Sequence, residues 1–206
     1  MRLLVATRSP GKQREATRLL AASPIEFVFP DDANVRESPT EDGLEVHDSF
    51  QANARAKAEY FCRLTGLPTV ADDSGLEVIS LGGEPGVRSK RWAGASGSPG
   101  EVDLANNAQL VRRLAGAADN RRRARYRCVL VLVRRIGAIA EVFDQSCLGL
   151  ILPEPRGAGG FGYDPYFQSD DLGQTFGEAS DPEKDRVSHR GKAFRALLEG
   201  LATKPL

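Results

Sequence analysis

The stretch "RLLVATRSPGKQREATRLLAAS", residues 2–23, decides the fold class of this chain. Residues 2–6 are apolar enough for a buried strand, and residues 7–12 carry the proline and glycine of a turn. Residues 13–23 place apolar side chains at helical spacing against charged ones. A strand, a short loop and a helix in that order are typical of an α/β fold. We therefore expect an α/β protein that opens with this unit.

The rest of the chain continues the alternation of strands and helices. Residues 50–66 are alanine-rich, lack proline and end at Gly66, which predicts a helix of about four turns. Residues 67–81 predict a strand, a break at Ser74-Gly75 and a second strand. The other expected elements are a helix over 98–116, strands over 126–135 and 138–152, a glycine-rich aromatic loop over 154–167 and a helix closing 181–202. No repeat or linker divides the chain, so we expect a single domain over residues 1–206 with two lobes.

Composition argues against several classes of partner. The 206 residues carry 28 basic and 28 acidic side chains, which gives no electrostatic case for binding nucleic acid or a membrane surface. The basic run at 121–127 leads into an apolar segment and is expected to be the solvated start of a strand. The N-terminal segment is too short in apolar residues for a signal peptide. The three cysteines lack metal-type spacing, which favours reduced core residues and a cytoplasmic protein.

The loop "ATRSPGK", residues 6–12, lies at the first junction between a strand and a helix. A helix N-terminus offers backbone N–H groups and a partial positive charge, which suit phosphate, and Lys12 would add a point charge. The spacing differs from that of a Walker loop. From these residues alone, a phosphate site and an ordinary capped helix with a surface lysine are equally open.

The segment "VADDSGLEV", residues 70–78, sets two carboxylates side by side at the end of an apolar run. Successive strand side chains point to opposite faces, so Asp72 and Asp73 are not expected to share one proton. Acids at a strand end suit Mg²⁺, which prefers carboxylate oxygen and is completed by waters and substrate phosphates. A solvated turn is the alternative. Further acids that could add oxygen ligands precede the predicted second helix: Glu41, Glu45 and Asp48.

Three more groups of residues are candidates for a functional site, and the first two also allow a purely structural interpretation. Asn53 and Lys57 are four apart and share one face of an alanine-lined helix, where they meet either solvent or partners. Phe161 and Tyr163 lie in the glycine loop "GGFGYDP" and either stack on a base or plug the core beneath the loop. A last group follows near the C-terminus, where Ser188 is a plausible N-cap for the final helix: Lys184, His189 and Arg190.

In order along nearly the whole chain, these motifs resemble the inosine/xanthosine triphosphate pyrophosphatase family. The resemblance rests on "ATRSPGK", "SFQANARAKA", "GLPTVADDSGLEVISLGGEPGVRSKRWAG", "GAGGFGYDPYF" and "SHRGKA". It implies hydrolysis of the non-canonical purine triphosphates ITP, dITP and XTP to monophosphate and pyrophosphate, with Mg²⁺ as cofactor. It also implies an elongated two-lobed α/β fold with a long central mixed sheet flanked by helices and a nucleotide cleft between the lobes, usually as a homodimer.

The resemblance also implies a role for individual residues. Asp73 would be the general base and a Mg²⁺ ligand, with Glu45 as second ligand in preference to Glu41, and Ser74 would touch substrate. Phe161 would stack on the purine. The triphosphate loop would comprise Thr7, Arg8, Ser9, Pro10, Gly11 and Lys12. The base and ribose pocket would comprise Phe161, Gly162, Tyr163 and Asp164, closed by Lys184, His189 and Arg190.

Two positions depart from the family pattern. Ser9 stands where the family usually has Asn, and its hydroxyl reaches less far toward a phosphate oxygen. Ala52 stands where Glu often precedes the helix Asn, which removes one carboxylate. These departures leave open a nucleotide-binding regulatory module that holds a triphosphate without cleaving it. A Mg²⁺ phosphatase of small phosphate esters is a second alternative, and orthophosphate would be its first product.

Overall fold

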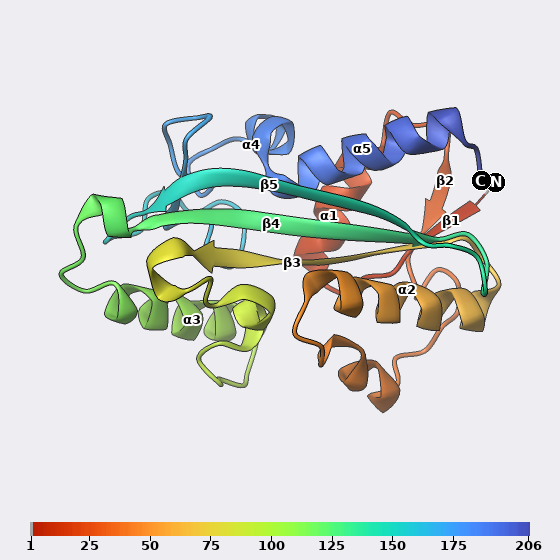
Figure 1. Ribbon diagram of the computed structural model, residues 1–206, viewed down its shortest axis with the longest axis horizontal. Helices are drawn as coiled ribbons and strands as arrows, with labels where there is room; N and C mark the ends of the chain where they lie inside the picture. Colours follow the sequence, from red (N-terminus) through yellow and green to blue (C-terminus); the bar gives the residue numbers. More distant parts are fainter. Residues whose placement is uncertain (1) are drawn as a thin grey trace. The chain divides into compact units, whose positions relative to one another are not determined.

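The computed structural model describes residues 2–206, and its strands form one mixed sheet in the order β2-β1-β3-β4-β5-β6 (Figure 1). β1 runs parallel to β2 and to β3, whereas β5 and β6 are antiparallel. The strands are β1 (Arg2–Val5), β2 (Glu26–Val28), β3 (Thr69–Val78), β4 (Arg123–Val133), β5 (Glu141–Ile151) and β6 (Phe167–Ser169). The expected α/β fold with a mixed sheet is thereby confirmed.

Helices flank this sheet, as expected. The α-helices are α1 (Pro10–Leu20), α2 (Phe50–Thr65), α3 (Pro99–Arg113), α4 (Asp181–Val187) and α5 (His189–Thr203). Short 3₁₀ helices are η1 (Pro39–Glu45), η2 (Ile79–Leu81), η3 (Gly86–Arg91) and η4 (Asp119–Arg121). No helix within residues 2–206 combines the length and the apolar character that crossing a membrane requires.

The chain divides into two compact units, each with its own core. Unit 1 comprises Met1–Asp73, Cys128–Gln145 and Lys192–Leu206, and unit 2 comprises Ser74–Arg127 and Ser146–Gly191. In unit 1, α1 and α5 lie on one side of the strands and α2 on the other (Figure 1). Buried side chains of α1 and α5 pack there against Leu3 and Leu130. In unit 2, Leu110 of α3 packs with residues of β3, β4 and β5.

The predicted ends of α2 agree with the structure, whereas α1 begins earlier than expected and α3 ends at Arg113 instead of residue 116. Ser49 caps α2 by accepting a hydrogen bond from the backbone N–H of Ala52, and Gly66 ends it in the left-handed conformation at φ 69°. α1 begins at Pro10 rather than after residue 12, because the fixed φ of proline suits the first helical position. Lys12 therefore lies in the first turn of α1 and not in a loop.

The expected break at Ser74-Gly75 is wrong, because β3 runs without interruption from Thr69 to Val78. Gly75 serves close packing instead of a turn. A Cβ at this position would lie 2.3 Å from Oγ of Ser89 and 2.5 Å from the carbonyl oxygen of Gly86. The sheet thus needs a residue without a side chain where η3 crosses it.

The expectation of a solvated basic run at 121–127 holds only in part. Arg122 is buried and donates from Nη2 to the carbonyl oxygen of Leu114 at 2.9 Å and from Nε to that of Ala117 at 3.0 Å. It therefore satisfies carbonyl groups at the end of α3. Arg123 and Arg125, in contrast, pair with Asp170 and Glu77 on the surface of unit 2.

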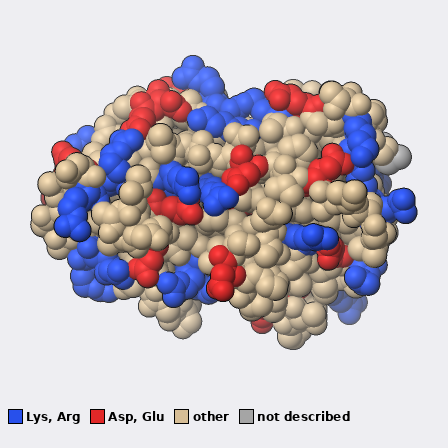
Figure 2. Space-filling model, viewed as in Figure 1, with Lys and Arg blue, Asp and Glu red and all other residues tan. Residues whose placement is uncertain are grey.

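The remaining surface and cysteine expectations agree with the structure. Basic and acidic side chains are interspersed on the face drawn in Figure 2, as the balanced composition suggests. Cys62, Cys128 and Cys147 are all buried and reduced, with no disulfide among them. They behave as small core residues.

Candidate active-site residues in the two units

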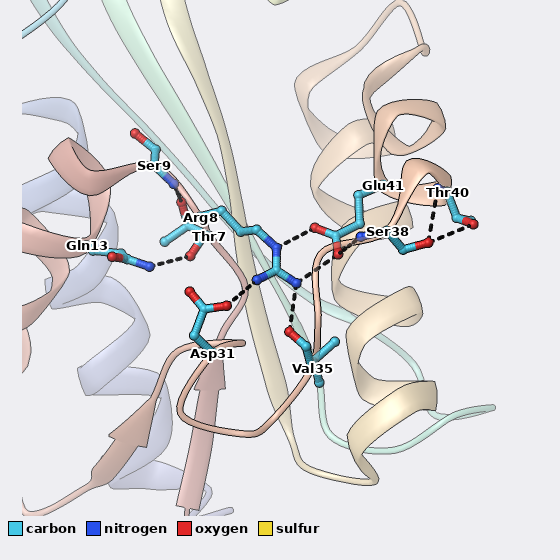
Figure 3. Close-up of polar contacts among 9 residues, drawn as sticks. All are labelled: Thr7, Arg8, Ser9, Gln13, Asp31, Val35, Ser38, Thr40 and Glu41. Atoms are coloured by element: carbon cyan, nitrogen blue, oxygen red, sulfur yellow. Dashed lines mark hydrogen bonds and ion pairs between the residues drawn. The ribbon is translucent and has the colours of Figure 1, made fainter. Parts of the chain in front are cut away.

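The loop after β1 is held by short-range hydrogen bonds (Figure 3). Oγ1 of Thr7 accepts from the backbone N–H of Ser9 at 3.2 Å, and Nε2 of Gln13 donates to the carbonyl oxygen of Thr7 at 3.0 Å. Ser9 is in the N-cap position of α1 but makes no capping bond with its side chain. Pro10 and Gly11 form the start of the helix. The predicted triphosphate loop therefore lies at a helix N-terminus, where anions bind favourably.

The side chain of Arg8 points toward the segment after β2 (Figure 3). Its Nε and Nη2 donate to the two carboxylate oxygens of Glu41 at 2.7 and 2.8 Å. Nη1 donates to Asp31 at 2.5 Å and Nη2 to the carbonyl oxygen of Val35 at 3.0 Å. Arg8 was predicted among the triphosphate ligands, but its guanidinium is engaged by acids of its own chain.

Two lysines from different helices reach Asp72, which lies inside β3 and not at a strand end as expected. Nζ of Lys12 in α1 lies 3.0 Å from Oδ2 of Asp72. Nζ of Lys57 in α2 donates to the backbone carbonyl oxygen of Asp72 at 2.5 Å and forms an ion pair with Glu45. Lys57 therefore has partners and does not face solvent, which resolves the alternative left open for this helix face.

Asp72 and Asp73 point to different helices, as alternation along a strand requires. The Asp72 carboxylate meets Lys12 in α1, whereas Oδ2 of Asp73 accepts a hydrogen bond from Nδ2 of Asn53 in α2 at 2.9 Å. Asn53 is fully buried, and its Oδ1 accepts from the backbone N–H of His47 at 2.9 Å. The two neighbouring acids are therefore not a dyad that shares one proton.

Burial and charge shift the pKa values in this group in opposite directions. Burial raises the pKa of Asp73 above the usual aspartate value and Glu45 adds to the rise, against the opposing effect of Lys57 and Lys12. Burial also disfavours the charged form of Glu45, but Lys57 and Lys12 outweigh it and hold the pKa of Glu45 at about 2. Although burial disfavours the charged form of Lys57, the surrounding carboxylates raise its pKa. Asp73 is thus the carboxylate in this group whose environment favours taking up a proton.

The donor set fits Mg²⁺. The charge of Glu45 raises the pKa of Asp73, an unfavourable interaction that a divalent cation would relieve. No group of three or more His, Cys, Asp or Glu side chains among residues 2–206 has the arrangement of a metal site. Mg²⁺ needs only one or two carboxylates when waters and substrate phosphates complete its shell. Both glutamates have a basic partner, Arg8 for Glu41 and Lys57 for Glu45, but Glu45 is the one whose charge raises the pKa of Asp73 and is therefore the better placed of the two.

In unit 2, the glycine loop is organised by a buried ion pair. Oδ2 of Asp164 lies 2.6 Å from Nζ of Lys184 and accepts from the backbone N–H of Phe161 at 2.8 Å. The same Nζ lies 5.0 Å from the centre of the Phe161 ring, and the guanidinium carbon of Arg190 lies 5.7 Å from it. Gly160 has φ 73°, and a Cβ there would lie 2.1 Å from Oδ2 of Asp164. The half-buried Phe161 ring therefore lies within cation–π distance of two basic side chains.

Helix α3 binds both backbone polar groups of Gly162, the residue that follows Phe161 in this loop. The backbone N–H of Gly162 donates to Asp103 at 2.8 Å, and its carbonyl oxygen accepts from Nδ2 of Asn107 at 2.9 Å. Asp103 and Asn107 are four residues apart and therefore share one face of α3. Sequence reasoning missed both residues, because they lie more than 50 positions from the loop that they hold.

The remaining predicted residues of unit 2 have structural partners. Nη2 of Arg190 donates to Oγ of Ser74 at 2.6 Å. Tyr163 is buried in the core and donates its hydroxyl to the carbonyl oxygen of Ser89 at 2.8 Å. The buried His189 ring stacks on Tyr126 with 4.6 Å between ring centres. The side chains of Tyr163 and His189 thus support the loop and helix, whereas Phe161 and Arg190 remain in contact with each other.

Oγ of Ser188 accepts from the backbone N–H of Gly191 at 3.1 Å, as the predicted N-cap of α5 requires.

Comparisons with known proteins agree with these motifs over the full chain. The model of the Ham1 family matches residues 3–200. The chain is 48% identical to a dITP/XTP pyrophosphatase of Aromatoleum aromaticum, with 100% of this chain and 98% of the relative covered. It is 43% identical to a dITP/XTP pyrophosphatase of Anaeromyxobacter sp., with 98% of each chain covered. The solved structure of a HAM1 protein from Coxiella burnetii matches with a TM-score of 0.85 and 32% identity, over 98% of this chain and 99% of that one. The chain belongs to the Ham1 family.

Proposed function

We propose that this protein hydrolyses the non-canonical purine triphosphates ITP, dITP and XTP to the monophosphate and pyrophosphate. The observation that carries the proposal is the pairing of Lys12 and Lys57 with Asp72 and Glu45 beside the N-terminus of α1. Relatives that are 43% and 48% identical bear the name dITP/XTP pyrophosphatase. Cleansing of the nucleotide pool is the role that follows.

The lysines of unit 1 suit a triphosphate. Phosphate esters resist hydrolysis because charge on their oxygens repels a nucleophile, so catalysis depends on neutralisation and positioning. Lys12 and the N–H groups of the first turn of α1 would bind phosphate oxygens, with Thr7 and Ser9 beside them. Mg²⁺ held by Glu45 and Asp73 would neutralise further phosphate charge and lower the pKa of a bound water.

Asp73 would act as the general base. Its raised pKa suits a carboxylate that takes a proton from the attacking water at the α-phosphorus. The hydrogen bond from Asn53 fixes the orientation of the Asp73 carboxylate before substrate arrives. Asp72 is paired with Lys12 and is the weaker candidate for this role.

The residues of unit 2 would bind the base. Phe161 offers a flat ring for stacking, which does not distinguish one purine from another. Arg190 and Lys184 carry only donors, which match a 6-oxo group and leave the 6-amino group of adenine without a partner. A buried donor left without a partner costs about 1–3 kcal/mol, or roughly 10- to 100-fold in discrimination.

The test is a substrate panel with two variants. Wild-type protein and Mg²⁺ should release pyrophosphate from ITP, dITP and XTP with kcat/KM well above that for ATP. Asp73→Asn should abolish turnover and leave nucleotide affinity within about tenfold, since it removes the base but little contact area. Asp42→Asn, which alters an exposed acid of the same η1 helix as Glu45, is the control and should leave turnover unchanged. Nucleotide binding without turnover in the wild-type protein would contradict the proposal.

We also propose a homodimer in the cytoplasm. A groove of about 390 Å³ in unit 1 is lined by Gln51, Arg55 and residues of β4, β5 and the connection between them. Ile139 lies on this groove and is 93% exposed, an apolar surface that a second copy of the chain would cover. Light scattering of wild-type protein should give twice the chain mass, and Ile139→Asp should shift it toward the monomer. A monomeric wild-type protein would contradict this assembly.

A further inference from the structure

We propose that Arg8 is a positioning residue that fixes the phosphate loop and the helix η1, with its metal-binding Glu45, in one arrangement. This inference rests on the proposed function, because it assigns the purpose of the arrangement to Mg²⁺ and triphosphate binding. It gives Arg8 a different role from its neighbours in the loop, which would meet the phosphates directly.

Four of the five N–H groups of the Arg8 guanidinium are already bound by its own chain. All three of its nitrogens donate, to Glu41, Asp31 and the carbonyl oxygen of Val35 (Figure 3). The contact with Glu41 has the two-bond geometry in which planar guanidinium matches carboxylate best. The hydrogen bond to Glu41 outweighs burial in raising the pKa of Arg8. A phosphate group would have to displace these acids to reach the side chain.

The contact between Arg8 and Glu41 joins the phosphate loop to the helix η1. The backbone of Arg8 lies between Thr7 and Ser9 in the loop that opens α1. Glu41 lies in η1 and also accepts from the backbone N–H of Ser38 at 3.3 Å, which closes the capping box of that helix. η1 ends at Glu45, whose carboxylate pairs with Lys57. One side chain therefore ties the loop to the helix that presents the proposed metal ligand.

The contact between Arg8 and Glu41 is also shielded from solvent. The side chains of Arg8 and Glu41 are 18% and 13% exposed, whereas those of the Arg2–Glu26 pair, also in unit 1, are 52% and 61% exposed. Exposed pairs contribute little, but removal of one partner from a shielded pair leaves the other charge uncompensated. Arg2 and Glu26 thus provide a matched control of the same chemistry.

Hydrogen exchange of the protein without metal or nucleotide tests the anchoring itself. Arg8→Met should speed amide exchange over residues 31–45 by about tenfold or more, because local opening no longer breaks the anchoring bonds. Arg2→Met should leave this segment unchanged. Arg8→Lys keeps the charge, loses the two-bond geometry and should give an intermediate rate. Exchange over residues 31–45 that is unchanged in Arg8→Met and Arg8→Lys would overturn the inference.

The Mg²⁺ dependence of the reaction tests the purpose of the anchoring. Arg8→Met should raise the half-saturating Mg²⁺ concentration by about tenfold, the usual scale for a residue that orients a metal ligand, with a smaller effect on kcat at saturating Mg²⁺. Glu41→Gln should have a similar effect, and the double variant should be no worse than the worse single one. Additive effects, or an unchanged Mg²⁺ dependence together with faster exchange, would overturn the positioning role. If wild-type protein failed to hydrolyse the triphosphates, the proposed function would fall. Calorimetric titration with Mg²⁺ alone would then compare the Mg²⁺ affinities of the wild-type protein and Arg8→Met.

Discussion

Asn53 holds Asp73 through a hydrogen bond of 2.9 Å from Nδ2 to Oδ2, and Asn53 is itself fixed by the backbone of His47. The amide is fully buried, so solvent does not compete for this contact. An alanine-rich helix face brings α2 close to the strand and makes the short contact possible. The orientation of the proposed base is therefore set by a neutral side chain, which leaves the charge of Asp73 in place.

The first prediction concerns this contact. Asn53→Ala should lower kcat by about 10- to 100-fold with little change in KM, because it disorients the Asp73 carboxylate without touching substrate. Steady-state kinetics with ITP measure this, and Arg63→Ala, an exposed change on the same helix, should behave as wild type. An unchanged kcat in Asn53→Ala would show that Asp73 does not depend on this bond.

The second prediction concerns the stability of unit 2. Lys184 and Asp164 are paired at 2.6 Å, and their side chains are only 3% and 4% exposed. Lys184→Met should therefore lower the free energy of unfolding by about 3–5 kcal/mol, because it leaves a buried carboxylate uncompensated. Lys204→Met, which removes an exposed partner of Glu141, should cost no more than about 1 kcal/mol. Urea denaturation measures the free energy of unfolding of both variants. Equal losses of this free energy would contradict the assignment of a buried pair.

The third prediction concerns base selection. Phe161→Ala should weaken ITP and ATP alike, by the roughly 1–3 kcal/mol that stacking contributes. Arg190→Ala should lower kcat/KM for ITP far more than for ATP, since only the 6-oxo group accepts from its donors. Ser74→Ala is the companion variant, because it removes the acceptor that orients Arg190 at 2.6 Å. If Phe161→Ala and Arg190→Ala change the ITP-to-ATP ratio equally, Arg190 does not recognise the base.

The fourth prediction concerns the continuous strand β3. Gly75→Ala should destabilise the protein by about 1–3 kcal/mol, because the new methyl group would overlap Ser89 and the backbone of Gly86. Gly100→Ala should be neutral or stabilise by up to about 1 kcal/mol, because nothing lies within 4 Å of its Cβ position. Thermal unfolding of the two variants provides the comparison. A neutral Gly75→Ala would mean that the strand tolerates a side chain there.

The sequence predicted the elements whose signals are local. β1 and α2 follow from an apolar run and from an alanine-rich segment that lacks proline and ends at Gly66. The break at Ser74-Gly75 was wrong because the reason for Gly75 lies in η3, eleven or more residues further along the chain. A Ser-Gly pair that serves close packing has the same composition as one that forms a turn.

The candidate site was predictable in its motifs but not in its pairings. Asp73, Phe161 and Lys12 stand in segments that carry recognisable chemistry. The partners of Arg8 lie 23 and 33 residues away, and those of Gly162 lie 55 and 59 residues away. Such contacts depend on tertiary packing, so neither the residue types nor the resemblance that placed Arg8 in the triphosphate loop could predict them.

The most direct test of the account follows the oxygen of the attacking water. ITP is hydrolysed in water enriched in ¹⁸O with Mg²⁺ present, and the products are identified by mass spectrometry. The account predicts inosine monophosphate that carries one ¹⁸O atom, together with unlabelled pyrophosphate, because the water attacks the α-phosphorus. Release of orthophosphate as the first product, or label in the pyrophosphate, would contradict it.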